Sequence, residues 1–93
     1  MILFAVGDRH FEIVVMSDTD FDGLAWELRE LISNEHTKEQ ASLCQIIRHD
    51  DLKKVEFKTS ETFSVPLEAF EELLSNFNKT GGRDFMEDTD YES

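Results

Sequence analysis

The chain has 93 residues, 40% of them hydrophobic, and its 21 acidic residues against 9 basic ones give a net charge of −12. This length allows one domain with a real core, and such an acid excess excludes a protein drawn to nucleic acid or to anionic membranes. The single cysteine, Cys44, excludes an internal disulfide framework and fits a reducing, cytoplasmic location. No apolar run approaches the roughly 18–20 residues that cross a bilayer.

The first elements in chain order are two short apolar runs, Ile2–Val6 and Phe11–Met16. They are separated by Gly7-Asp8-Arg9-His10, and β-branched and aromatic residues around a Gly-Asp pair are typical of a β-hairpin. The second run is apolar on both faces, which favours a central strand.

The next stretch, Ser17–Ser33, has apolar residues at the spacing of one helix face, from Phe21 to Ile32. Acids at its start suit the positive end of a helix dipole. We therefore predict a helix here. At roughly 100° per residue, Trp26 falls on the face opposite to the apolar stripe, so the chain's only tryptophan is predicted to face solvent.

The middle of the chain allows two interpretations. Thr37-Lys-Glu-Gln40 has the form of a capping box, which favours a short helix through Cys44. Leu43–Arg48 fits a strand equally well. Val55–Thr59 alternates and predicts a strand. Pro66 is suited to the first turn of a second helix, whose apolar face carries Leu67, Phe70, Leu73, Leu74 and Phe77.

Together these elements predict an α+β fold: an antiparallel sheet of about four strands with two amphipathic helices packed on one face, in ββα-ββα order. Residues 1–80 would form the single domain and residues 81–93 an acidic C-terminal tail. The predicted core consists of Phe21, Leu28, Leu31, Phe70, Leu74 and Phe77 from the helices with Ile13, Val15 and Phe57 from the strands.

The negative charge is unevenly distributed along the chain. Residues 18–33 carry five acids against Arg29, residues 55–78 carry five against Lys58, and residues 79–93 carry five against Lys79 and Arg83. A helix face that is merely solvated usually mixes both signs. The predicted helices and the tail are therefore candidate contact surfaces for a basic partner.

One motif suggests a metal site. Asp18-Thr-Asp20-Phe-Asp22-Gly23 matches the opening of an EF-hand calcium loop, but Arg29 occupies the twelfth position, where a bidentate acid is required. Scattered histidines and one cysteine lack zinc-site spacing, and no phosphate loop or nucleophile elbow is present. We expect a non-enzymatic protein without metal or cofactor, with calcium binding as a lesser alternative.

These observations predict a small acidic inhibitor or interaction protein that presents carboxylates to a basic, nucleic-acid-binding surface of a partner protein. It would not itself bind nucleic acid or membrane, and a homodimer is left open. The predicted contact residues are Asp18, Asp20, Asp22, Trp26, Glu27, Glu30, Glu68, Glu71, Glu72, Asp84, Phe85, Glu87, Asp88, Asp90 and Tyr91.

In size, charge and layout the chain resembles the DNA-mimic inhibitors that phages use against restriction, CRISPR or repair enzymes, although no shared motif carries the resemblance. It also resembles immunity proteins that neutralise basic nuclease toxins. A third alternative is a host adaptor domain whose acidity is incidental and which binds another protein's helix or groove.

Overall fold

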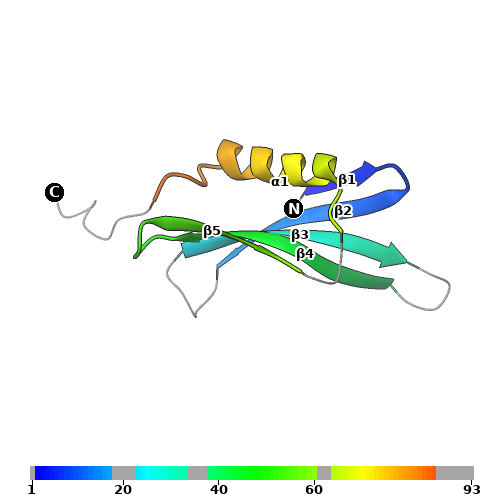
Figure 1. Ribbon diagram of the computed structural model, residues 1–93, viewed down its shortest axis with the longest axis horizontal. Coiled ribbons are helices and arrows are strands. Elements are labelled where there is room, and N and C mark those ends of the chain that lie inside the picture. Colours follow the sequence, from blue (N-terminus) through cyan, green and yellow to red (C-terminus); the bar gives the residue numbers. More distant parts are fainter. Residues whose placement is uncertain (1, 18–22, 34–37, 61–63, 86–93) are drawn as a thin grey trace.

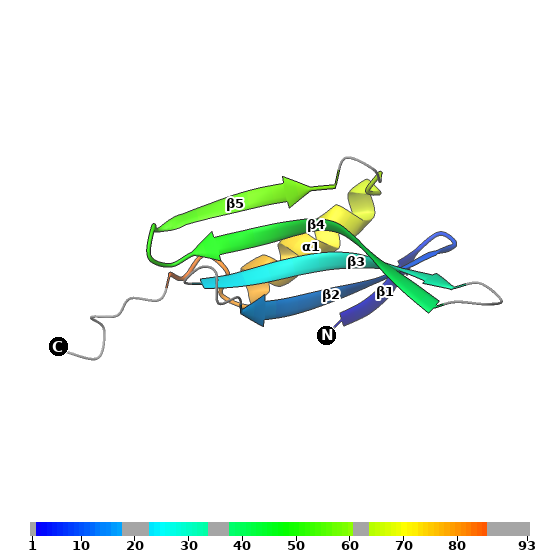
Figure 2. The same ribbon diagram turned by 90° about the horizontal axis from the view of Figure 1, so that it is seen from below.

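A computed structural model describes residues 2–17, 23–33, 38–60 and 64–85. Five strands form one antiparallel sheet in chain order: β1 (Ile2–Val6), β2 (Arg9–Ser17), β3 (Gly23–Ser33), β4 (Lys38–His49) and β5 (Lys54–Thr59). One helix, α1 (Leu67–Lys79), follows in the described part and lies across one face of the sheet (Figures 1 and 2). No described helix has the length and apolar character needed to cross a membrane.

The predicted α+β arrangement with two helices in ββα-ββα order is wrong. The described residues of the first predicted helix form the end of β2 and the whole of β3, and the ambiguous middle segment forms β4 rather than a helix. The first hairpin, the strand over 55–59 and the helix after Pro66 are confirmed.

Pairing with β2 explains why Gly23–Ser33 is a strand. Leu24, Trp26 and Leu28 alternate along β3, and the last two lie opposite Val15 and Ile13 of β2. Residues spaced by four share a face in both a helix and a strand, so Leu24 and Leu28 fit both patterns. Intrinsic propensity is a weak prior, and the apolar partner strand decides between them.

Gly23 allows β3 to begin close to β4. Its φ is +152°, and a Cβ atom there would lie 1.8 Å from the carbonyl oxygen of Arg48. Only glycine permits that approach. Further along the pair, the register shifts between Leu28 and Arg29, so that Leu43 is an extra residue on β4 and is buried together with Cys44.

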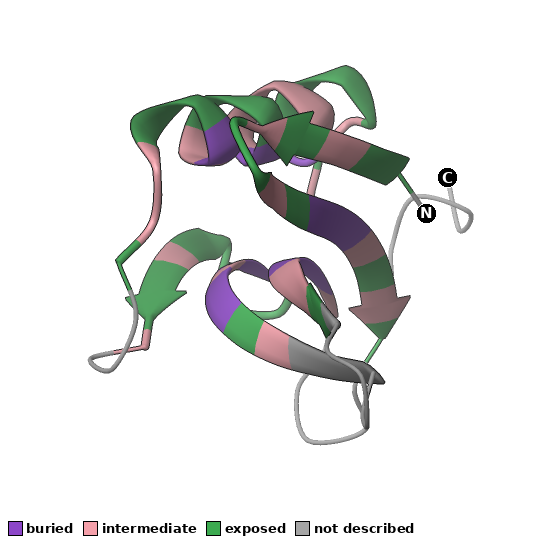
Figure 3. Cartoon of the chain, turned by 90° about the vertical axis from the view of Figure 1, so that its right-hand side faces the viewer, coloured by how far each residue is buried: buried purple, intermediate pink, exposed green. Residues whose placement is uncertain are grey.

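The core lies between the sheet and α1, as the burial colours of Figure 3 show. The helix contributes Ala69, Leu73 and Phe77, spaced by four residues, and the sheet contributes Phe11, Ile13, Trp26, Leu28, Leu43, Cys44 and Ile46. The core predictions for Ile13, Leu28 and Phe77 are confirmed. Those for Val15 and Phe57 are wrong, because these side chains are 44% and 51% exposed. Leu31, Phe70 and Leu74 are half-buried, and Phe21 lies outside the described residues.

Candidate functional site

The outer face of α1 carries three exposed glutamates, Glu68, Glu71 and Glu72. α1 starts after Pro66, whose carbonyl accepts hydrogen bonds from the amides of Ala69 and Phe70 at 3.0 and 3.1 Å. Burying the stripe of Ala69, Leu73 and Phe77 turns Glu68 and Glu71 to within roughly 40° of the direction opposite to the core, and Glu72 to roughly 80° from it. All three are exposed, as the sequence predicts for contact residues.

No described cation lies within ion-pair distance of these three carboxylates. Glu68 and Glu72 are one helical turn apart and repel each other by a few tenths of a kcal/mol, roughly. Only Glu68 lies in the first turn, where the helix dipole favours an acid. The helix therefore carries a like-charge cluster in which only Glu68 gains from the helix dipole.

The acids of β2 and β3 are engaged within the protein instead. Glu30 lies on the helix side of the sheet, where the Arg9 guanidinium donates to both of its carboxylate oxygens at 2.8 and 2.7 Å. These hydrogen bonds lower the pKa of Glu30 below its ordinary value of 4.5, against the opposing effect of burial. Glu30 is thus held by an internal partner rather than left free for an external one.

A polar row crosses the sheet face that α1 does not cover. Glu27 is only 6% exposed. Its carboxylate accepts one hydrogen bond from Arg29 Nε and a second, at 2.6 Å, from Gln45 Nε2. Arg29 Nη1 also lies 3.7 Å from an oxygen of the buried Glu12. Glu27, predicted from sequence as a contact residue, is therefore a buried and internally paired acid.

Trp26 is 1% exposed, so the prediction that it faces solvent is wrong. Its indole N–H donates to Thr80 Oγ1 at 2.9 Å, its ring meets Phe77 edge-on at 4.8 Å, and the Arg48 guanidinium lies 5.5 Å from the ring centroid. Trp26 has become a central core residue because a strand, unlike a helix, places positions 24, 26 and 28 on one face.

Residues 80–85 return from α1 to the sheet. Arg48 Nη1 donates to the carbonyl of Gly81 at 3.0 Å, and the amide of Gly82 donates to Phe77 at 2.7 Å. A Cβ atom on Gly82 would lie 2.4 Å from the Phe77 ring, so only glycine fits there. Asp84 is exposed and Phe85 is half-buried, with Lys53 Nζ 5.9 Å from its ring.

The other predicted contact residues lie outside the described residues. These are Asp18, Asp20 and Asp22 of the calcium-like motif and Glu87, Asp88, Asp90 and Tyr91 of the tail. Within the described ranges, no group of three or more His, Cys, Asp or Glu side chains could hold a metal ion.

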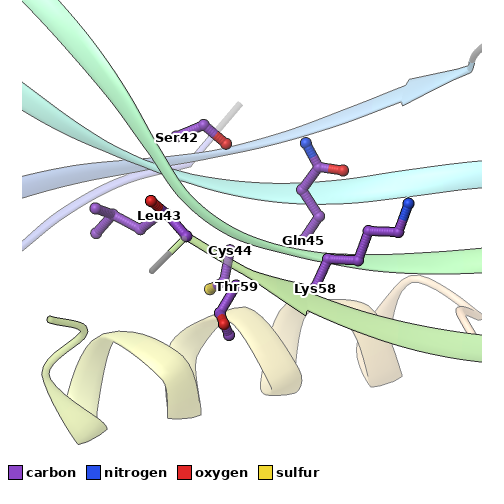
Figure 4. A pocket seen from close by; sticks show the side chains of 7 residues that line it. Ser42, Leu43, Cys44, Gln45, Lys58 and Thr59 are labelled. Carbon is purple, nitrogen blue, oxygen red and sulfur yellow. The ribbon is translucent and has the colours of Figure 1, made fainter. Parts of the chain in front are cut away.

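A pocket of about 210 Å³ lies where β4 extends beyond the end of β5 (Figure 4). Gln45 and Lys58 point to the sheet face away from α1, while Cys44 and Thr59 point toward the helix (Figure 4). Burial raises the pKa of the Cys44 thiol to about 11, so it stays protonated at neutral pH. This thiol is a core group and not an activated nucleophile.

Sequence reasoning missed an apolar groove between β5 and the start of α1. It has a volume of about 420 Å³ and is lined by Phe57, Thr59, Ser60, Val65, Leu67 and Phe70. Assigning Phe57 and Leu67 to buried faces concealed it. The signal that could have revealed it is the position of Val55–Thr59 as the last strand predicted from the sequence, since such a strand often lies at the edge of a meander.

Comparisons of the chain with protein-family models, with curated proteins and with solved structures give no match.

Proposed function

We propose that this protein is a non-enzymatic interaction protein that binds the basic, nucleic-acid-binding surface of a partner through the acidic outer face of α1, acting as a DNA mimic. The observation that carries the proposal is the cluster of Glu68, Glu71 and Glu72, exposed and without a described cationic partner. Such a cluster repels itself, which is a cost that contact with Lys and Arg side chains of a partner would relieve.

The spacing of the cluster supports mimicry of a phosphate backbone. Glu68 and Glu72 are separated by about 6 Å along the helix axis, and Glu71 lies between them. The resulting density, about one charge per 3 Å, is close to the 3.4 Å per charge along one strand of double-helical DNA. A rigid helix on a folded sheet holds these charges in place before the partner arrives, which reduces the entropy lost on binding.

Other acids of the protein, unlike the glutamates of α1, are paired with arginines. Glu12, Glu27 and Glu30 each contact an arginine, and Asp50 contacts Arg48 in a buried pair at 3.0 Å. The negative charges of these acids in the described sheet are therefore largely neutralised by arginines. The glutamates of α1 keep their negative electrostatic field. Inhibition of a restriction, CRISPR or repair enzyme, or neutralisation of a basic nuclease toxin, would each use this field in the same way.

The proposal is tested with two doubly substituted variants of equal total charge. Glu68→Lys with Glu72→Lys reverses the helix face, whereas Asp8→Lys with Asp51→Lys reverses two exposed acids in the turns between strands. Each protein is immobilised, exposed to a nuclease-rich lysate and eluted with a salt gradient, and the retained proteins are identified by mass spectrometry. Association rates are then measured with the purified partner, with duplex DNA as competitor.

The helix variant should associate roughly tenfold more slowly than the parent, because steering by the acidic face is lost. The turn variant should keep most of the parent's rate. Duplex DNA should displace the partner, and added salt should weaken the complex. Equal binding by both variants, or binding that neither salt nor DNA affects, would reject mimicry and favour the adaptor alternative.

A further inference from the structure

The outer edge of β5 is unpaired among the described residues. β5 follows β4 as the last strand of the sheet, and the amide of Ser60 donates to the carbonyl of Leu43 at 2.9 Å. In an antiparallel ladder, hydrogen-bonded positions alternate along a strand. The backbone N–H and C=O groups of Val55, Phe57 and Thr59 therefore point away from β4, toward the free edge. Figure 2 shows β5 at that edge of the sheet.

The same edge is flanked by exposed apolar side chains. Val55 is 37%, Phe57 51% and Leu67 67% exposed, and the last two line the groove of about 420 Å³ described above. The Phe57 ring packs edge-on against Phe70 at 5.2 Å, so it is already oriented. Proteins usually protect a free edge strand with charges, prolines or a covering element. α1 packs chiefly over β3 and β1 and meets β5 through Phe70, and Phe57 stays half-exposed beside it.

The other face of β5 carries charges of both signs. Lys54, Glu56 and Lys58 alternate with the apolar positions, and Lys54 Nζ lies 2.7 Å from Glu56 Oε1. In a chain of net charge −12, this strand has more cations than anions. Electrostatic repulsion between two copies is therefore weaker at this edge than over α1.

We propose that β5 pairs with β5 of a second copy in antiparallel orientation, about a twofold axis at Phe57, to form a continuous sheet across a homodimer. In an antiparallel pair, residues opposite each other have their side chains on the same face of the sheet. Because side chains alternate between faces along a strand, the numbers of two opposite residues must differ by an even number. The twofold axis must therefore pass through a residue position and not between two residues. Centred on Phe57, the register places Glu56 opposite Lys58 of the other copy, twice, and Val55 opposite Thr59.

The register centred on Glu56 is the main competitor. It would place Glu56 opposite Glu56 of the other copy and Lys54 opposite Lys58 of the other copy, so every charged pair would repel. The register centred on Phe57 makes both charged pairs attractive and brings two exposed Phe57 rings together. It also joins the free N–H and C=O groups of Val55, Phe57 and Thr59, so backbone, charge and apolar surface all favour this arrangement over the one centred on Glu56.

The experiment measures dimerisation by sedimentation equilibrium from micromolar to millimolar concentrations. Glu56→Lys and Lys58→Glu are made singly and together, and far-UV circular dichroism checks the fold of each. The double variant has the same composition and net charge as the parent. Matched controls reverse charges on α1, with Glu68→Lys for the first substitution and Lys79→Glu for the second.

We expect the parent to dimerise and each single β5 variant to do so about tenfold more weakly, since two attractive cross-strand pairs become repulsive. The double variant should recover the parent's affinity, and the α1 controls should change it little. A parent that remains monomeric throughout overturns the proposal. Stronger dimerisation of Lys58→Glu alone also overturns it, because that result fits the register centred on Glu56.

Discussion

The contacts of Trp26 give the sharpest test of the core. Replacing Trp26 by Phe keeps an aromatic ring against Phe77 but removes the indole N–H that donates to Thr80 Oγ1 at 2.9 Å. That hydrogen bond contributes about 1 kcal/mol net. The Arg48 guanidinium lies 5.5 Å from the ring centroid. Its cation–π interaction is weaker with a phenyl ring than with indole, which lowers the free energy of unfolding by about 1 kcal/mol more. Loss of ring volume adds about 1 kcal/mol.

The free energy of unfolding should therefore fall by about 2–3 kcal/mol, measured by urea denaturation with far-UV circular dichroism, which does not depend on tryptophan. Thr80→Val provides a cycle, because it removes the same hydrogen bond from the other side. The two substitutions together should cost about 1 kcal/mol less than their sum. A loss below about 0.5 kcal/mol for Trp26→Phe is typical of surface positions and would refute the burial of Trp26.

Two further predictions concern titration. Glu30→Gln should cost at most about 1 kcal/mol at neutral pH, since Arg9 is partly exposed. Because the folded pKa of Glu30 is lowered, its contribution is present above the unfolded value of 4.5 and is lost as pH falls through the folded value, so the variant should lose less stability than the parent in urea titrations below that pH. Cys44, whose thiol pKa is raised to about 11, should resist a thiol-specific chromogenic reagent at pH ~8 in the folded protein and react fully in urea; rapid labelling of the folded protein would show that the thiol is accessible.

The sequence predicted those elements whose pattern allows one interpretation. Val55–Thr59 alternates strictly, and the segment after Pro66 has a helical stripe with no competing period, so both are confirmed. The glutamates on the solvent side of that helix followed from the same stripe. Local pattern and tertiary structure agree at these places, and the prediction needed no knowledge of partners.

The stretch from Gly23 to Ser33 could not be assigned in this way. Its apolar residues fit a helical face and also alternate from Leu24 to Leu28, and the decision is made by pairing with β2 and β4, which flank it in the sheet. Predicting a helix for this stretch wrongly placed Trp26 on the surface, whereas it lies in the core. It also placed Glu27 on a contact surface, whereas Glu27 belongs to a buried ion pair. The ion pairs with Arg9 and Arg29 depend on strand register, which a linear sequence does not display.

The contact between Trp26 and Thr80 has a consequence for how the chain folds. Neighbouring strands of this meander are also neighbours in sequence, so hairpins can form early and quickly. Closure of the core instead joins positions 54 residues apart through the indole hydrogen bond and 33 residues apart through the Arg48–Gly81 contact. During synthesis the sheet therefore leaves the ribosome with its aromatic face open until α1 and residues 80–82 follow. That interval is when this protein is most exposed to aggregation, and a chaperone that shields apolar surface would act on it then.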